Sequence, residues 1–366
     1  MSACPTSYSG GEPKDSLCRD NGLALYFNFP FCQFTSYDLG YIDINNKIMN
    51  QNHRITLFII FWIILTVCSQ HSQAEPVNFG KTKTFIDDTY FSLHFDNPPK
   101  QIISVSPSAT EILGVIGADS MLVGVSLYSY YPLSIKDLPK VGSYVKPNIE
   151  QIISLNPDLV VMSFEGAPRS DVNKLRRLNL NVAVLRSEKF SDIIKNINWL
   201  GEVLEHQKEA KEAAENLENR YKQIRSLVQG MPKPRAFYSI ALNPITSVGA
   251  KSFINSLIHD AGGINISGDI DQAYPRLTIE SVIAMSPDVM IFSSGMGNAL
   301  DMENQLPFWK RWKNIPAVRD QRFVEVDHDI INRSGPRVVQ ALASIAQQLH
   351  PEKAEEIQRI MKNEKP

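Results

Sequence analysis

The sequence predicts an α/β protein of two lobes, each with a central parallel sheet, and one long helix that joins them. Residues 149–163 (IEQIISLNPDLVVMS) recur 130 positions later as residues 279–293 (IESVIAMSPDVMIFS), with six of fifteen positions identical. Each copy has the pattern of a short amphipathic helix, a Pro-Asp turn and a buried strand. Two copies of one α/β unit indicate two lobes of common design.

The segments before the first copy alternate between strand and helix patterns. Residues 85–95 are expected to form a short strand pair, and residues 101–106 (QIISVS) have the composition of a buried strand. Pro107 then opens a helical pattern, because proline fits the first turn of a helix. Residues 122–126 (LVGVS) predict the next strand. A strand, a helix and a strand at this spacing are typical of a parallel α/β unit.

The segment between the two copies predicts the joining helix. Residues 190–230 carry apolar side chains at helical spacing, and residues 207–229 are rich in strong helix formers. At 1.5 Å per residue this second part would be a rod of roughly 35 Å. Its position favours a strut between an N-terminal lobe of residues 75–189 and a C-terminal lobe of residues 231–366. A peripheral helix packed on one lobe is the alternative.

The beginning of the chain predicts export. Residues 55–67 (ITLFIIFWIILTV) are an uncharged apolar run, shorter than the about 20 residues that a membrane span needs. The run fits the apolar part of a signal peptide at residues 49–74, with cleavage after Ala74. A short buried helix and a retained anchor are the alternatives. Residues 1–48 would then be a non-native or disordered extension before a start at Met49.

Charge and cysteine usage exclude other classes of protein. The chain has 366 residues and a formal net charge of −2, which argues against a nucleic acid partner because phosphate binding needs a basic surface. All four cysteines precede the predicted cleavage site, so the mature chain has no disulfide framework. A lipid anchor at Cys68 is the less favoured alternative, because Val67 is bulkier than the residue expected before a lipidated cysteine.

No enzyme mechanism assembles from the sequence. The histidines after the predicted cleavage site are scattered without ligand spacing, so no metal site is expected. Ser143 and Lys146 match the SxxK pattern of serine acyl enzymes, but the companion motifs of that class are missing. A secreted serine hydrolase is therefore the weakest alternative, and neither catalytic residues nor a cofactor are expected.

Aromatic residues follow the predicted strands and precede the repeated helices. Tyr128 comes shortly after the strand at residues 122–126, and Phe164 directly follows the first repeated strand. Tyr144 and Tyr274 each stand six residues before the glutamate of their copy. Loops at strand ends of α/β sheets bind ligands, and aromatic rings offer large planar contact surfaces. Each ring alone fits half-buried packing, but the matching positions together favour a ligand cleft between the lobes.

Glu150 and Glu280 occupy the same place in the two copies, in the first turn of each predicted helix. The helix dipole stabilises a carboxylate there by about 0.3–1 kcal/mol, which explains either glutamate alone. Two equivalent exposed carboxylates on related lobes can also meet two symmetric basic pockets on a dimeric partner.

Five stretches together resemble a known family. They are PPKQIISVSPSATEILGVIGA, VGVSLYSYYP, IEQIISLNPDLVV, the joining helix and AGGINI, and the likeness covers residues 99–350. The family is that of periplasmic substrate-binding proteins with a helical backbone, which serve ABC importers for vitamin B12, haem and ferric siderophores. The likeness is strongest to its vitamin B12-binding members. It implies two Rossmann-like lobes of the class III type, with the ligand-binding domain at about residues 100–354.

The resemblance also implies roles for individual residues. Ligand contacts would come from Tyr128, Tyr144, Phe164, Tyr274, Asp329 and Arg333. Glu150 and Glu280 would dock onto the permease dimer of an ABC importer. The vitamin B12-binding members have tryptophans where this chain has Tyr144, Tyr274 and Phe164, so the stacking faces are kept while the residue types differ.

The ligand implied by the resemblance is a cobalamin-like corrinoid. Haem-binding members usually place an iron-ligating tyrosine directly after a glycine, where this chain has Ser143, with Tyr144 one position later. This difference favours a corrinoid over haem. Arg169 and Arg333 keep a ferric siderophore open as the other alternative. The protein is expected to be a periplasmic monomer.

Overall fold

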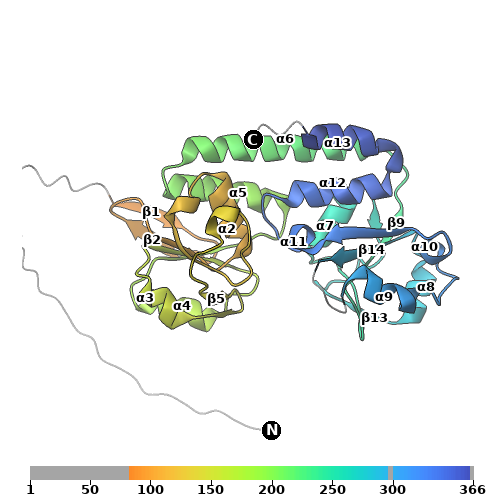
Figure 1. Ribbon diagram of the computed structural model, residues 1–366, viewed down its shortest axis with the longest axis horizontal. Helices are drawn as coiled ribbons and strands as arrows, with labels where there is room; N and C mark the ends of the chain where they lie inside the picture. The colour runs from red at the N-terminus through yellow and green to blue at the C-terminus, as the bar shows by residue number, and fades with distance from the viewer. Residues whose placement is uncertain (1–81, 296–299, 363–366) are drawn as a thin grey trace, which may run out of the picture. The chain divides into compact units, whose positions relative to one another are not determined.

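The structure, a computed structural model, describes residues 82–295 and 300–362 (Figure 1). The predicted extension at residues 1–48 and the signal peptide at residues 49–74 lie outside the described residues, as do Cys68 and Ala74. Among the helices of the described ranges, none combines the length and the apolar character needed to cross a membrane.

The N-terminal lobe is built on a four-stranded sheet in which every neighbouring pair is parallel. Its order is β4-β3-β7-β8, with β3 at Ile102–Ser104, β4 at Leu122–Val125, β7 at Leu159–Ser163 and β8 at Val182–Leu185. Parallel neighbours require crossover connections, which here contain α2 (Pro107–Val115), α3 (Ile149–Ser154) and α4 (Arg169–Arg177).

The C-terminal lobe repeats this topology. Its order is β12-β9-β14-β15, again parallel throughout, with β9 at Arg235–Ser239, β12 at Ile264–Asn265, β14 at Val289–Ser294 and β15 at Phe323–Asp327. In each sheet the second strand along the chain lies at one edge, followed by the first, third and fourth. This shared order confirms the predicted α/β fold with two lobes of common design.

Helices cover both faces of these sheets, which explains why the central strands are apolar along their whole length. Successive side chains of a strand point to opposite faces. In β7, Leu159 and Val161 belong to the core that contains α2 and α5, while Val160 and Met162 belong to a second core beneath α3 and α4. Strand β14 divides its side chains between two clusters in the same way.

Helices α5 (Phe190–Val203) and α6 (Gln207–Val228) join the lobes (Figure 1). Helix α6 contacts α2 and α5 on the N-terminal side, and α12 (Val338–Leu349) and α13 (Ala354–Lys362) on the C-terminal side. Its buried face consists of Ala210, Ala214, Leu217, Tyr221, Ile224 and Val228. These side chains belong to one apolar core that includes strands of both sheets, so α6 is a strut shared by both lobes.

The repeated Pro-Asp turn has the same structural role in both lobes. Asp158 Oδ2 accepts hydrogen bonds from the backbone N–H groups of Lys100 and Gln101, at 2.8 and 2.9 Å. Asp288 Oδ2 accepts one from Arg235 N at 2.9 Å. Each aspartate thus fixes the start of the strand beside it, and this explains why the turn recurs in both copies.

The smaller elements complete the two lobes. Strands β1 (Lys83–Ile86) and β2 (Ser92–Phe95) form the predicted strand pair, which is antiparallel, and β5 (Gly142–Ser143) and β6 (Lys146–Pro147) form a second antiparallel pair. The C-terminal lobe adds β10 (Ala241–Leu242), β11 (Ile245–Thr246) and β13 (Arg276–Leu277), and the helices α7 (Phe253–Asp260), α8 (Ile279–Met285), α9 (Met302–Trp309), α10 (Pro316–Arg319) and α11 (His328–Ile331).

Candidate functional site

Tyr128 and Tyr144 form an exposed aromatic pair on the N-terminal lobe. Their ring centroids are 6.2 Å apart with an interplanar angle of 62°, an edge-to-face arrangement. Tyr144 lies in the tight turn between β5 and β6, which needs Gly142 at φ +87° because a side chain there would collide with the Lys146 carbonyl. The two rings are 48% and 36% exposed, so they have faces free for a ligand.

Tyr274 brings a ring from the C-terminal lobe towards this pair. It lies in the loop before β13 and is 62% exposed. Partial burial raises the pKa of its phenol, and the nearby Tyr144 phenol and Glu165 carboxylate raise it further. Both of these neighbours belong to the N-terminal lobe, so the Tyr274 phenol of the C-terminal lobe lies within electrostatic range of Tyr144. We call Tyr128, Tyr144 and Tyr274 the tyrosine site.

Phe164 is half-buried, and one of its ring faces is already covered. Its backbone N–H donates to Leu185 O at 2.9 Å, which continues the pairing of β7 and β8. The guanidinium carbon of Arg186 lies 3.6 Å from the ring centroid, in a cation–π contact. The neighbouring Glu165 carboxylate accepts hydrogen bonds from Ser163 Oγ and Ser187 N. Sequence reasoning identified Phe164 but missed its Arg186 cover.

Asp329 and Arg333 form a direct ion pair. Asp329 lies on α11, and its Oδ1 accepts a hydrogen bond of 2.6 Å from Arg333 Nη2 one helical turn later. The side chain of Asp329 is 42% exposed and that of Arg333 is 12% exposed. The structure therefore brings together these two predicted residues.

Two charged residues that the sequence reasoning missed complete this cluster. Glu111 of α2 has a side chain only 1% exposed, and its Oε1 accepts a hydrogen bond of 2.7 Å from Arg337 Nη2. Arg333 Nη1 lies 3.6 Å from the same oxygen. The sequence contained one indication of this cluster, which is a glutamate within the apolar stretch of α2. We call Glu111, Asp329, Arg333 and Arg337 the inter-lobe cluster.

The inter-lobe cluster borders the loop that carries Tyr128. The guanidinium carbon of Arg333 lies 5.7 Å from the ring centroid of Tyr130, and that of Arg337 lies 4.8 Å from Tyr131. Burial lowers the pKa of Arg337, but the hydrogen bond and charge of Glu111 outweigh this effect and leave the pKa above its ordinary value. Arg337 is therefore a fixed cation at neutral pH.

Glu150 and Glu280 lie in the first turns of α3 and α8, and both are exposed. Asn148 and Thr278 cap these helices through their side chains, so the glutamates are not needed as caps. Within the residues that the structure describes, neither carboxylate makes a hydrogen bond or an ion pair. Figure 1 shows α3 and α8 on the side of their sheets away from α6.

The remaining predicted candidates do not form a reactive site. Ser143 Oγ accepts a hydrogen bond from the backbone N–H of Lys146, a contact that closes the β5–β6 turn and activates no nucleophile. Arg169 is exposed at the start of α4. No group of three or more potential metal ligands is present in the described ranges.

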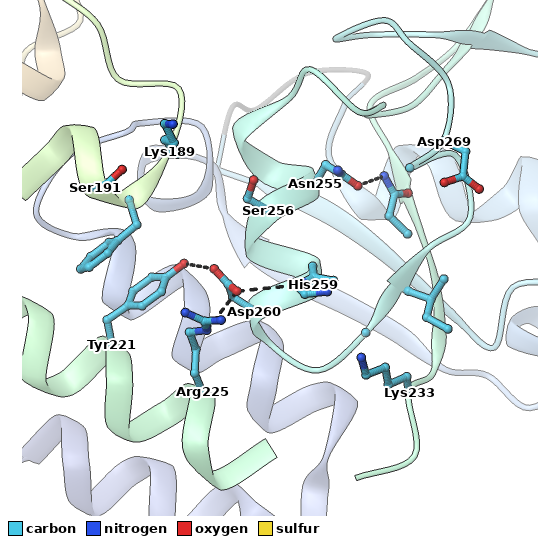
Figure 2. A pocket seen from close by; sticks show the side chains of 15 residues that line it. Lys189, Ser191, Tyr221, Arg225, Lys233, Asn255, Ser256, His259, Asp260 and Asp269 are labelled. Carbon is cyan, nitrogen blue, oxygen red and sulfur yellow. Dashed lines mark hydrogen bonds and ion pairs between the residues drawn. The ribbon is translucent and has the colours of Figure 1, made fainter. Parts of the chain in front are cut away.

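A cavity of about 550 Å³ lies elsewhere, between the N-terminus of α5, the side of α6 and helix α7 (Figure 2). Three of its polar side chains, Tyr221, Arg225 and Asp260, bond to one another. Tyr221 Oη donates to Asp260 Oδ2 at 2.6 Å, and Arg225 Nε lies 3.0 Å from Asp260 Oδ1. Burial raises the pKa of Tyr221, and its bond to Asp260 adds to the shift. The cavity contains none of the predicted ligand residues.

Comparison with known proteins identifies one family and, within it, similar vitamin B12-binding proteins. Residues 102–330 match the family model described as periplasmic binding protein. The vitamin B12-binding protein of Vibrio vulnificus (strain CMCP6) is 30% identical over 251 residues, which are 68% of this chain and 90% of that protein. The crystal structure of the periplasmic vitamin B12 binding protein of Vibrio cholerae matches with a TM-score of 0.62 and 28% identity, covering 71% of this chain and 99% of that one.

Haem-binding proteins share the same fold. The periplasmic heme-binding protein from Roseiflexus sp. RS-1, solved in its apo form, matches with a TM-score of 0.62 at 23% identity. That alignment covers 69% of this chain and 98% of the other.

Proposed function

Because the chain belongs to the periplasmic binding protein family, we propose that it captures a corrinoid, cobalamin or a related molecule, between its lobes and delivers it to an ABC importer. Members of this family are solute-binding proteins rather than enzymes; they bind small molecules and work with ABC transporter permeases. The corrinoid, the contact residues and the docking residues are the parts that we propose.

The observation that carries the proposal is the meeting of tyrosines from both lobes. Tyr128 and Tyr144 present exposed ring faces from the N-terminal lobe, and Tyr274 of the C-terminal lobe is exposed and lies within electrostatic range of Tyr144. Flat rings suit a flat macrocycle, because stacking buries large apolar areas at a small cost in side-chain entropy. Phe164 would contribute the part of its ring that Arg186 leaves uncovered.

The charge of the neighbouring residues favours a corrinoid over haem. Haem carries two propionates that need free cations, whereas the periphery of a corrin carries mainly amides. Arg333 already pairs with Asp329, and Arg337 already pairs with Glu111. Paired arginines can still donate hydrogen bonds to amide oxygens, but they offer no uncompensated positive charge to a carboxylate.

Delivery requires a contact with the permease, and we propose Glu150 and Glu280 for it. Both carboxylates are exposed and make no ion pair within the described part of the chain. They lie at equivalent places in two lobes of the same topology, so they can face two equivalent basic sites on a permease dimer. The protein would dock as a monomer.

Export follows from the same role. We propose that residues 49–74 direct the chain to the periplasm and are removed after Ala74, with a lipid anchor at Cys68 as the alternative. Mass spectrometry of the protein isolated from its native host decides between the two, because a lipidated N-terminus at Cys68 and a free N-terminus at Glu75 differ in mass.

Calorimetric titration with three ligand classes tests the function. We expect a saturable heat with cyanocobalamin, and weaker binding of haem and of a ferric hydroxamate siderophore. Tight binding of haem without binding of cyanocobalamin would make the protein a haem carrier of the same fold. Tight binding of the ferric hydroxamate alone would make it a siderophore carrier.

A further inference from the structure

A buried carboxylate connects the two lobes next to the tyrosine site. The Glu111 side chain is 1% exposed, and its Oε1 receives Arg337 Nη2 at 2.7 Å and Arg333 Nη1 at 3.6 Å. Its second oxygen, Oε2, has no hydrogen-bond partner among the described residues. Both arginines follow β15 in the C-terminal lobe, whereas Glu111 belongs to α2 of the N-terminal lobe.

The inter-lobe cluster is neutral as it stands. Glu111 and Asp329 supply two negative charges, and Arg333 and Arg337 supply two positive ones. Removal of the Glu111 charge would leave two guanidinium groups with Asp329, which already bonds to Arg333, and with the weaker charge effect of Asp327 on Arg337. Among the described residues, the hydrogen-bond acceptor left to Arg337 would then be the Asp329 carbonyl, which accepts from Nη2 at 3.2 Å.

The two arginines also contact the loop that carries Tyr128, one of the three tyrosines of the site. Arg333 lies over the ring of Tyr130, and Arg337 lies over the ring of Tyr131. Their side chains remain 12% and 19% exposed, so each reaches the surface beside that loop. A change in the net charge of the cluster would therefore change the affinity for a charged ligand at the tyrosine site.

We propose that Glu111 is a positioning residue that sets the charge class of the ligand. Its carboxylate compensates Arg333 and Arg337, so the site takes macrocycles whose periphery carries amides and discriminates against those that carry carboxylates. This inference rests on the proposed function only in placing the ligand at the tyrosine site. The energetic reason is that a partly buried arginine without a counter-ion binds an anion strongly, whereas a compensated one does not.

The first test uses Glu111→Gln, which keeps the shape of the side chain and removes its charge. Binding is measured for two matched pairs: cyanocobalamin with its derivative in which one side-chain amide is hydrolysed to an acid, and haem with its dimethyl ester. We expect the preference for the acid member of each pair to rise by about 10- to 100-fold over the full-length wild type. An unchanged preference in both pairs would overturn the proposal.

A second variant restores neutrality. Glu111→Gln combined with Arg337→Gln removes one charge of each sign, so the preference should return towards that of the wild type. If the double variant still favours the acid members as strongly as Glu111→Gln does, uncompensated charge is not the cause and the proposal fails.

Asp87→Asn provides the matched control. Asp87 is a fully buried carboxylate that pairs with Arg176, and Arg176 lies over the ring of Phe91, so the local chemistry is the same. The pair belongs to the N-terminal lobe and contacts none of the ligand tyrosines. We expect this variant to be less stable than the wild type but to keep its ligand preference. A shift equal to that of Glu111→Gln would mean that loss of stability, rather than charge, changes the preference.

A ligand-free measurement separates this proposal from the proposed function. Glu111→Ala leaves a small space between Arg333 and Arg337, and added acetate should bind there and raise the melting temperature of this variant more than that of the wild type. Sodium chloride at equal ionic strength should not do so. If no macrocycle binds the wild type, the proposed function fails while acetate rescue still supports the role of Glu111. Absence of rescue, in a folded Glu111→Ala protein, contradicts that role whatever the ligand.

Discussion

Arg337 Nη2 donates a hydrogen bond of 2.7 Å to Glu111 Oε1, although 226 positions separate the two residues along the chain. The bond joins α2 of the N-terminal lobe to the segment that begins α12 of the C-terminal lobe. Helix α6 joins the same lobes through the apolar core. The lobes are therefore connected by a polar contact beside the tyrosine site and by an apolar contact along the strut.

The first prediction concerns the stability that this contact provides. Arg337→Met leaves the buried Glu111 with Arg333 alone, at 3.6 Å, so we expect the free energy of unfolding in urea to fall by about 3 kcal/mol. Arg359→Met is the control, because Arg359 and its partner Glu355 are 73% and 90% exposed. The control should change the free energy by less than about 0.5 kcal/mol. Equal effects of the two substitutions would show that the pair of Arg337 and Glu111 contributes no more to stability than an exposed ion pair.

The second prediction concerns stability at alkaline pH. Burial raises the pKa of Tyr238 in β9 to about 12, although Ser293 and Asn332 near its hydroxyl offset part of the shift. Because the folded pKa lies above the value of about 10 expected in the unfolded chain, the folded state keeps the proton longer. The stability contributed by this group is therefore complete below about pH 10 and is lost as the pH rises towards 12.

Tyr238→Phe removes this titration. Its free energy of unfolding should fall less steeply than that of the wild type between about pH 10 and 12. Tyr90→Phe, at a tyrosine that is 91% exposed, serves as the control and should behave like the wild type. Identical alkaline slopes for Tyr238→Phe and the wild type would refute the assignment.

The third prediction tests the tyrosine site directly. Tyr144→Ala and Tyr274→Ala should each weaken the binding of cyanocobalamin by about tenfold or more, because each removes a stacking surface from one lobe. Tyr144→Trp should keep the affinity, since it keeps a flat ring. Tyr90→Ala, at an exposed tyrosine outside the site, is the matched control. Calorimetry measures all four, and an unchanged affinity in both site variants would exclude these rings as ligand contacts.

The fourth prediction separates docking from capture. Glu150→Ala with Glu280→Ala should abolish ligand uptake by cells while leaving the affinity of the purified protein unchanged, because both carboxylates are exposed on α3 and α8. Glu209→Ala with Glu212→Ala removes two exposed glutamates from α6 and should leave uptake intact. Loss of affinity in the first double variant would assign these glutamates to the ligand instead.

Sequence reasoning recovered the features that local pattern determines. The repeat at residues 149–163 and 279–293 predicted α3, α8 and the two strands that follow. Helical spacing and a Pro-Asp turn could be recognised because they involve residues close together in the sequence. It did not reveal that Asp158 and Asp288 fix the start of another strand. That role depends on strand order within each sheet, which sequence spacing does not contain.

The polar part of the site was the least predictable. Glu111, Arg333 and Arg337 meet because α6 holds two lobes together, so their contact depends on the packing of elements more than 200 positions apart. The cover of Phe164 by Arg186 likewise arises where β7 and β8 end side by side. A charged residue within an apolar helix, as at Glu111, is the one local sign of such a contact.

Titration of the full-length wild type with cyanocobalamin, in parallel with the combined Tyr144→Ala and Tyr274→Ala variant, tests the central claim most directly. The account predicts saturation at one cyanocobalamin per wild-type chain, and no saturation over the same concentration range for the variant. No heat with cyanocobalamin or cobinamide, or equal binding by the wild type and the variant, would contradict it.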